Sequence, residues 1–210
     1  MLQAERRRVA DAIGELAART PGRSGNLSVR RADRFAITPT GIPYETVTPD
    51  DIAVVDRDGG EHLAGLSPSS ETPMHALIYR EIQPGAILHT HAPWPTTLAV
   101  LRTPIPPVHY LLAKAGPAVP VADYATYGTE ALGRNAVSAL RSTSGRACLL
   151  ANHGLLVTGE DLETVFDAHD QVAFTARLYV TAASIGDPAI LSATEMDRVG
   201  ARLADTEESQ

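Results

Sequence analysis

The chain has 210 residues, 44% of them hydrophobic and 20% charged, a size and composition that fit one domain, spanning residues 1–210, with its own buried core. A formal net charge of −7 without a long basic stripe argues against nucleic acid as a partner, and no apolar stretch is long enough to cross a membrane. The single cysteine, Cys148, excludes an intrachain disulfide and favours a reducing compartment, so we expect a cytoplasmic protein.

The first quarter of the sequence predicts a helix followed by strands. Apolar residues recur at helical spacing over residues 2–20, and a Pro-Gly pair then ends the pattern. Asp11 and Glu15 interrupt the apolar positions of this segment, so we expect no secretion signal. Turn-rich segments then separate three extended runs, at residues 26–30, 34–38 and 51–55.

The remainder of the sequence alternates between helices and strands. Helices are predicted at residues 71–82, 96–101, 129–141 and 162–183, and strands at residues 86–91, 147–152 and 154–157. This interleaving predicts one layered α/β domain. The polar end, residues 200–210, is expected to be a flexible tail.

Three histidines form a candidate metal site. His89 and His91 lie two apart in a predicted strand, so their imidazoles share one face of the sheet. His153 directly follows an apolar strand and precedes a glycine. Three imidazoles with one open position are the pattern of catalytic zinc, whereas a His-x-His pair taken alone is as typical of an ordinary half-exposed strand. His75 lies one turn after Glu71 and either supports this site or is structural.

A candidate anion site lies where a predicted helix begins. The segment Pro68-Ser69-Ser70-Glu71 places two hydroxyls and unpaired N–H groups at the positive end of the helix dipole, which is suited to a phosphate. The same residues also fit a simple helix cap. Two further turns, at residues 22–26 and 38–41, offer small polar side chains and fit plain turns equally well.

Taken in order, five segments resemble the signature series of the class II aldolase/adducin family, and the ordered set is far more specific than any one member. They are Ser24-Gly25-Asn26, Thr38-Pro39-Thr40-Gly41, Pro68-Ser69-Ser70-Glu71, His89-Thr90-His91 and Asn152-His153-Gly154. The segments at residues 37–45, 108–110, 124–129 and 187–188 are similar to the branch of the family that cleaves L-fuculose 1-phosphate.

This resemblance implies a fold, a reaction and a set of site residues. The implied fold is a single domain with a mainly antiparallel sheet flanked by helices, assembled as a homotetramer with active sites between subunits. The implied reaction is the zinc-dependent, reversible cleavage of a ketose 1-phosphate to dihydroxyacetone phosphate and a short aldehyde. The implied zinc ligands are His89, His91, His153 and Glu71, and Glu71 is also the catalytic base. The implied phosphate-binding residues are Asn26, Thr40, Gly41, Ser69 and Ser70, and Tyr110 is the implied proton donor.

The sequence departs from this branch at two places, and other functions stay open. No tyrosine follows Tyr179, although fuculose-phosphate aldolases carry one in the C-terminal tail. Arg23, beside the phosphate loop, is the second departure, and it either adds a phosphate contact or only covers the surface. A sugar-phosphate 4-epimerase, which has Asp in place of Glu71, is one alternative. A salvage aldolase for 5-deoxypentose phosphates and a sugar-phosphate dehydratase are others, and a non-catalytic adducin-like scaffold is the alternative from a different class.

Overall fold

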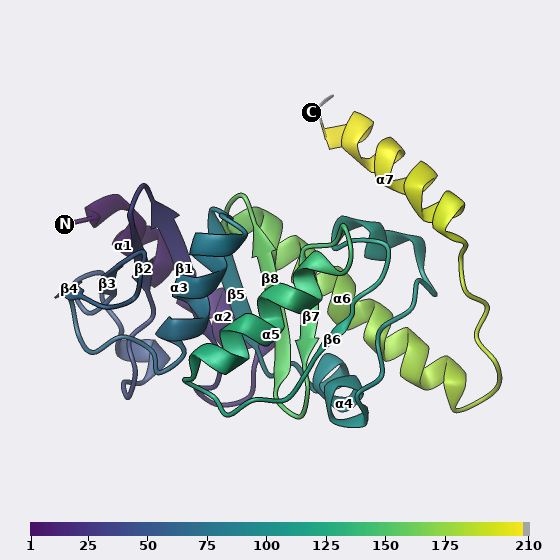
Figure 1. Ribbon diagram of the computed structural model, residues 1–210, viewed down its shortest axis with the longest axis horizontal. Helices are drawn as coiled ribbons and strands as arrows, with labels where there is room; N and C mark the ends of the chain where they lie inside the picture. Colours follow the sequence, from purple (N-terminus) through teal and green to yellow (C-terminus); the bar gives the residue numbers. More distant parts are fainter. Residues whose placement is uncertain (208–210) are drawn as a thin grey trace.

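Eight strands form one open sheet in the order β4-β3-β2-β1-β5-β8-β7-β6 in the computed structural model, which describes residues 1–207 (Figure 1). All neighbouring strands run antiparallel except β6 and β7, which run parallel. The strands are β1 Asn26–Arg31, β2 Arg34–Ile37, β3 Ala53–Asp56, β4 His62–Ala64, β5 Ala86–Thr90, β6 Val121–Ala122, β7 Ala147–Leu150 and β8 Gly154–Gly159. The predicted α/β domain with a mainly antiparallel sheet is therefore confirmed.

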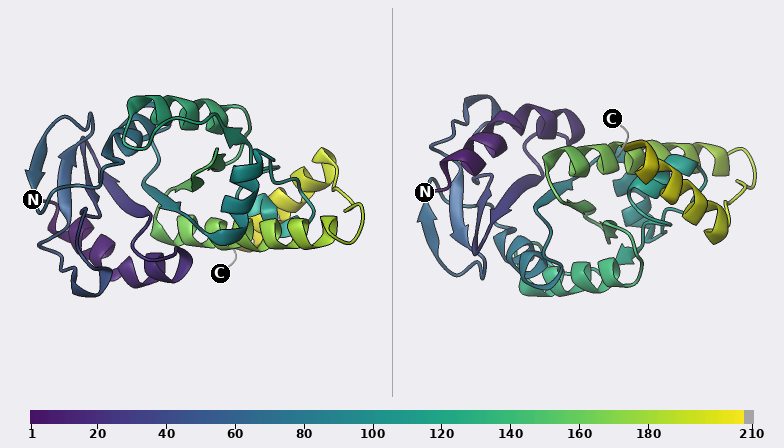
Figure 2. Two further views of the ribbon diagram at one scale, coloured as in Figure 1. Left: turned by 90° about the horizontal axis from the view of Figure 1, so that it is seen from below. Right: turned by 90° about the horizontal axis from the view of Figure 1, so that it is seen from above.

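Helices cover both faces of this sheet (Figure 2). The α-helices are α1 Gln3–Asp11, α2 Ile13–Arg19, α3 Thr72–Glu81, α4 Pro93–Leu101, α5 Glu130–Arg141, α6 Leu162–Ala183 and α7 Ala193–Glu207. Two short 3-10 helices, η1 Tyr44–Thr46 and η2 Tyr110–Lys114, lie in the connections. The helices α3 and α5 pack on one face with Ile87 of β5, while α1, α2, α4 and α6 pack on the other face with Leu88. Because side chains alternate between the two faces of a strand, β5 contributes residues to two separate hydrophobic cores.

Local sequence signals account for several of the helix boundaries. The Asp161 side chain accepts a hydrogen bond from the Thr164 N–H at 2.9 Å, and the Thr129 side chain accepts one from the Leu132 N–H at 3.3 Å, so both residues cap helices in the usual way. Gly85 follows α3, and a Cβ atom there would lie 1.8 Å from the carbonyl oxygen of Glu160. Only glycine fits this contact between the start of β5 and the end of β8.

The structure differs from the sequence predictions in four places. The helix predicted over residues 2–20 is two helices, because the backbone turns at Ala12 between α1 and α2. The short strands β4 and β6 were not predicted. The flexible tail expected at residues 200–210 is helical as far as residue 207, where α7 ends, and residues 208–210 lie outside the described residues.

No helix among residues 1–207 is both long and apolar enough to span a bilayer.

Three strand ends meet at one edge of the sheet. β1 begins at Asn26, β5 ends at Thr90 and β8 begins at Gly154, and the register pairs Asn26 with His89 and Thr90 with Leu155. Antiparallel pairing therefore brings segments from three distant parts of the chain to the same edge, and the candidate site lies there.

Candidate active site

Three histidines come together at this edge, as the sequence predicts. His89 and His91 come from the end of β5, and His153 comes from the turn between β7 and β8. One nitrogen from each ring lies within 4.8 Å of the others, and the His89 and His91 Nε2 atoms are 3.1 Å apart. The ring centroids lie 4.7–5.0 Å apart in edge-to-face orientations. All three imidazoles therefore point toward one small volume.

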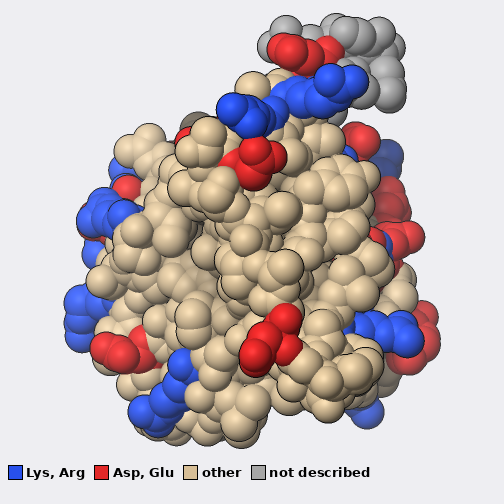
Figure 3. Space-filling model, turned by 90° about the vertical axis from the view of Figure 1, so that its right-hand side faces the viewer, with Lys and Arg blue, Asp and Glu red and all other residues tan. Residues whose placement is uncertain are grey.

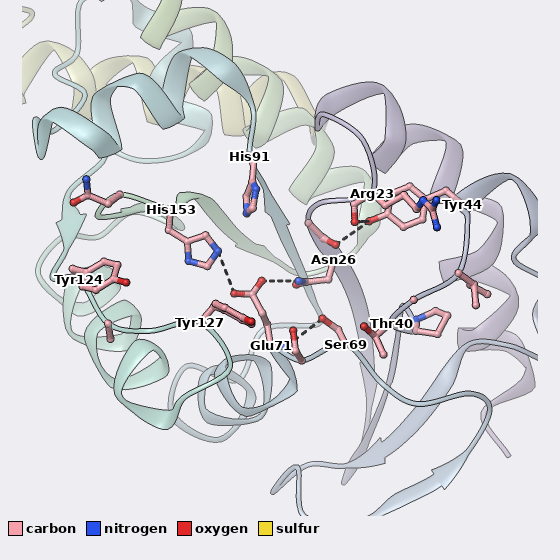
Figure 4. A pocket seen from close by; sticks show the side chains of 17 residues that line it. Arg23, Asn26, Thr40, Tyr44, Ser69, Glu71, His91, Tyr124, Tyr127 and His153 are labelled. Carbon is pink, nitrogen blue, oxygen red and sulfur yellow. Dashed lines mark hydrogen bonds and ion pairs between the residues drawn. The ribbon is translucent and has the colours of Figure 1, made fainter.

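Glu71 completes this cluster from the start of α3. Its Oε2 atom lies 3.2 Å from His89 Nε2, and its Oε1 atom lies 3.3 Å from His153 Nε2. The Asn26 Nδ2 atom donates a hydrogen bond to Oε2 at 2.7 Å (Figure 4). Oε1 is buried and has no hydrogen-bond partner among the described residues. A buried carboxylate oxygen without a partner is costly unless another group compensates it.

The protonation states of these groups suit a divalent cation. Burial lowers the pKa of His89 to about 4, and burial also lowers the pKa of His91, so both rings are neutral near pH 7. Burial raises the pKa of Glu71, but the combined lowering by His89, His153 and the Asn26 amide is larger, so the pKa of Glu71 lies below the ordinary value. Neutral imidazole and ionised carboxylate are the forms that bind metal. Three nitrogens and one orphaned oxygen therefore fit a metal ion with nitrogen and oxygen ligands.

Buried hydrogen bonds on the side away from the histidine cluster fix the orientation of His89 and Asn26. His89 Nδ1 donates a hydrogen bond to the Leu155 carbonyl oxygen at 2.9 Å, which leaves Nε2 to face the cluster. Asn26 Oδ1 lies 2.5 Å from Nε2 of His75, and Nδ1 of His75 lies 2.7 Å from the hydroxyl of Ser28. Burial lowers the pKa of His75 to about 3. Of the two roles left open for His75, the structure favours support of Asn26, the side chain that holds Glu71.

The predicted phosphate residues line one cleft beside the histidines. The cleft has a volume of about 560 Å³, and its lining includes Asn26, Thr40, Gly41, Ser69 and Ser70. Figure 4 shows Glu71 and Asn26 in the middle of this cleft, with His153 and Tyr124 on one side and Thr40 and Tyr44 on the other. The predicted serine cap is wrong in detail, because Glu71 occupies the N-cap position of α3 and no side chain caps it. The Ser69 hydroxyl instead accepts a hydrogen bond from the Glu71 N–H at 3.3 Å.

Comparison with known proteins identifies the family. A family-wide sequence profile described as "Class II Aldolase and Adducin N-terminal domain" matches residues 8–180. The chain belongs to the class II aldolase and adducin family. A 5-methylthioribulose-1-phosphate/5-deoxyribulose-1-phosphate aldolase from Rhodospirillum rubrum is 42% identical over 180 residues, which cover 85% of this chain and 80% of that protein. The L-fuculose phosphate aldolase of Escherichia coli (strain K12) is 40% identical over 169 residues, or 80% of this chain and 77% of that protein.

A solved structure agrees with these sequence relatives. An L-fuculose 1-phosphate aldolase superposes on this chain with a TM-score of 0.91 and 37% identity, covering 96% of both chains. The protein is therefore a class II aldolase, and the family resemblance drawn from the five ordered segments is confirmed.

One predicted site residue of the aldolase does not reach the cleft of its own chain. Tyr110 begins η2, is 48% exposed and stacks near His109, with ring centroids 4.7 Å apart. It is not among the residues that line the cleft. Among the described residues, no hydrogen bond or ring contact joins Tyr110 to Glu71 or to the three imidazoles.

The structure also brings residues to the aldolase cleft that were not among the predicted site residues, although a phosphate contact was one of two roles left open for Arg23. Arg23, Tyr44, Tyr124, Tyr127 and Asn152 all line it. Tyr124 and Tyr127 belong to a segment that carries the family resemblance, and their 56% and 66% exposure marks them as available to a ligand. The sequence indicates a place near the site for Asn152 only because it precedes His153. In the structure Asn152 has a positive φ of 54° and shapes the turn that carries His153.

Proposed function

We propose that this aldolase holds one zinc ion with His89, His91, His153 and Glu71 and reversibly cleaves a ketose 1-phosphate to dihydroxyacetone phosphate and a short aldehyde. The observation that carries this proposal is the Glu71 carboxylate, which is buried among three imidazoles with one oxygen unpartnered. Three imidazoles and one carboxylate match the ligands that zinc prefers. Zinc bound there would act as a Lewis acid toward the substrate carbonyl.

Glu71 is the base in this proposal. In the direction of bond formation, its carboxylate removes a proton from the hydroxymethyl carbon of dihydroxyacetone phosphate. The hydrogen bond from Asn26 to Oε2 holds this carboxylate in the cleft. A lowered pKa makes Glu71 a modest base, and its position beside the bound carbon compensates for this. In the cleavage direction Glu71 returns the same proton.

The substrate phosphate is assigned to the other part of the cleft. Thr40, Gly41, Ser69 and Ser70 line it and offer hydroxyl and backbone N–H donors. Asn26 has one N–H left, because the other already bonds to Glu71. The phosphate-binding role expected for Asn26 is therefore shared with its role in holding the base.

Tyr110 and the oligomeric state form one joint proposal. The face on the right of Figure 1, where α6 ends, shows few charged side chains in its centre (Figure 3). The exposed side chains of this region and of α4 include Val100, Leu101, Ile185 and Ile190. Such a surface fits contact with further copies of the chain. We assign a homotetramer in which Tyr110 serves the active site of a neighbouring subunit as proton donor.

The function is tested by metal analysis and by product analysis together. Purified protein is expected to contain about one zinc per chain and to release dihydroxyacetone phosphate from L-fuculose 1-phosphate, 5-deoxyribulose 1-phosphate or 5-methylthioribulose 1-phosphate. The preferred ketose identifies the aldehyde. A protein that carries metal but only interconverts epimers of a sugar phosphate would support the 4-epimerase instead. Light scattering that gives a monomer at assay concentrations, with activity intact, would contradict the shared site.

A further inference from the structure

Arg23 is the only lysine or arginine among the described residues that line the active-site cleft. Its guanidinium makes no hydrogen bond or ion pair within residues 1–207, although the Arg23 carbonyl oxygen accepts one from the Tyr44 hydroxyl. The nearest arginines along the chain are engaged, since Arg19 pairs with Asp170 at 2.7 Å and Arg30 donates to the Pro84 carbonyl oxygen at 2.9 Å. Arg23 therefore places a guanidinium without a partner among residues 1–207 at the lining of the cleft.

The backbone that carries Arg23 is held firmly while its side chain is left free. The hydroxyl of Tyr44 lies 2.9 Å from the carbonyl oxygen of Gly25 and 3.3 Å from that of Arg23. Gly25 has a φ of +93°, and a Cβ atom there would lie 2.6 Å from the His89 carbonyl oxygen, so this loop sits directly against the end of β5. Figure 4 places Arg23 beyond Asn26 as seen from Glu71, on the side of the cleft where Thr40 and Tyr44 lie.

The charges of the protein groups that line the cleft favour such a cation. A phosphate monoester carries between about 1.5 and 2 negative charges near pH 7, and the Glu71 carboxylate adds one more. The donors Thr40, Gly41, Ser69 and Ser70 are neutral, and Asn26 has already given one N–H to Glu71. None of these protein groups carries a positive charge that would offset the charge of the phosphate. A guanidinium donates charge-assisted hydrogen bonds to phosphate oxygens, with a geometry that neutral hydroxyls lack.

We infer that Arg23 donates to the phosphate of the bound substrate and supplies the positive charge that selects a dianionic phosphoryl group. This inference rests on the proposed function, because it takes the phosphorylated ketose as substrate. Arg23 is a binding and specificity residue, and it takes no part in proton transfer at Glu71. Its contact to phosphate persists from the bound ground state to the transition state, so it contributes mainly to affinity.

The test compares Arg23→Ala with Arg7→Ala, which removes the same charge from an exposed position of α1 outside the cleft. Hydrogen bonds to charged groups correspond to about 10–100-fold in affinity, and because Arg23 is exposed we expect the lower end of that range. Arg23→Ala should raise KM for the ketose 1-phosphate and the inhibition constant of inorganic phosphate about tenfold, with kcat and zinc content little changed. Arg23→Lys should recover part of the loss, and Arg7→Ala should behave as the parent.

Two outcomes separate failure of this inference from failure of the proposed function. If the parent cleaves a ketose 1-phosphate and Arg23→Ala keeps the KM and the phosphate inhibition constant of the parent, Arg23 does not bind phosphate and only the present inference fails. If the parent cleaves none of the three ketoses, the proposed function fails. Calorimetric titration with inorganic phosphate then still tests Arg23, because binding that is equal in parent and Arg23→Ala, or absent from both, overturns the assignment.

Discussion

Replacement of Glu71 by Gln separates its role as a base from its role in holding the site together. A glutamine has nearly the same size, and its amide oxygen can still accept the hydrogen bond from Asn26 Nδ2 that Oε2 accepts at 2.7 Å. Its NH₂ group then takes the place of Oε1, which lies 3.3 Å from His153 Nε2 in the parent. The variant should therefore fold with its active-site hydrogen bonds intact.

The sizes of the two effects differ enough to be told apart. Exchange of a charged acceptor for a neutral one in the Asn26 hydrogen bond changes the free energy of unfolding by about 1 kcal/mol. Loss of a general base slows proton transfer by about 10²–10⁴-fold, which is about 3–5 kcal/mol in activation free energy. An amide cannot accept the substrate proton. The rate effect should therefore exceed the stability effect several-fold.

The assay follows deuterium entering dihydroxyacetone phosphate in heavy water without any aldehyde. The parent should exchange one hydroxymethyl hydrogen stereospecifically, and Glu71→Gln should exchange it about 10²–10⁴-fold more slowly. Glu81→Gln is the matched control, because it makes the same change at the exposed end of the same helix. It should exchange as fast as the parent. Zinc content and the urea unfolding midpoint are measured on all three proteins.

One result would refute this reasoning. If Glu71→Gln retains zinc and exchanges deuterium at the rate of the parent, Glu71 is not the base and another group takes the proton. A parent that exchanges no deuterium but turns over a sugar phosphate would point to a reaction that begins with bond cleavage, as in the 4-epimerase.

Three further predictions concern metal, phosphate and pH. His153→Ala should lose both zinc and activity, and full zinc occupancy by elemental analysis would show that His153 is not a ligand. Ser70→Ala should chiefly raise KM for the phosphorylated ketose, because the contact is uniform, and a collapse of kcat at unchanged KM would indicate a structural role. The metal-free protein should lose stability as pH falls from 6.5 toward 3, since burial lowers the pKa of His75 to about 3 and the unfolded chain alone binds that proton. A urea midpoint that stays constant across this window would contradict the burial of a neutral His75.

The sequence predicted those parts of the site that depend on local geometry. His89 and His91 share a face because side chains alternate in any strand, so their pairing needed no tertiary information. The meeting of Glu71 with Asn26 depends on the register of β1 against β5 and on the packing of α3, and local patterns do not encode either. Only the family resemblance joined these residues in advance.

The missed helix and the position of Tyr110 outside the cleft have physical explanations. Residues 200–210 were expected to be a flexible tail and no helix was predicted directly before them, although Met196, Val199 and Leu203 recur at helical spacing and Met196 is only 3% exposed. Tyr110 was assigned to the site by resemblance, and its half-exposed position outside the cleft is a tertiary fact that no local pattern contains. Arg23 gave a signal as a basic residue beside the phosphate loop, but its lack of a partner within residues 1–207 is known only from the structure.

The central position of β5 couples the accuracy of the site to the stability of the core. Leu88 and Thr90 alternate with Ile87 and His89 along this strand, and both neighbouring strands fix its register. A shift by one residue would turn His89 toward α6 and expose Leu88 to the cleft. Each such shift would therefore remove leucine and isoleucine side chains from the cores and destabilise the fold, whether or not a metal or a substrate is bound. The packing of both cores and the orientation of His89 and His91 depend on the same strand. Mutations that loosen either core should therefore reduce activity first.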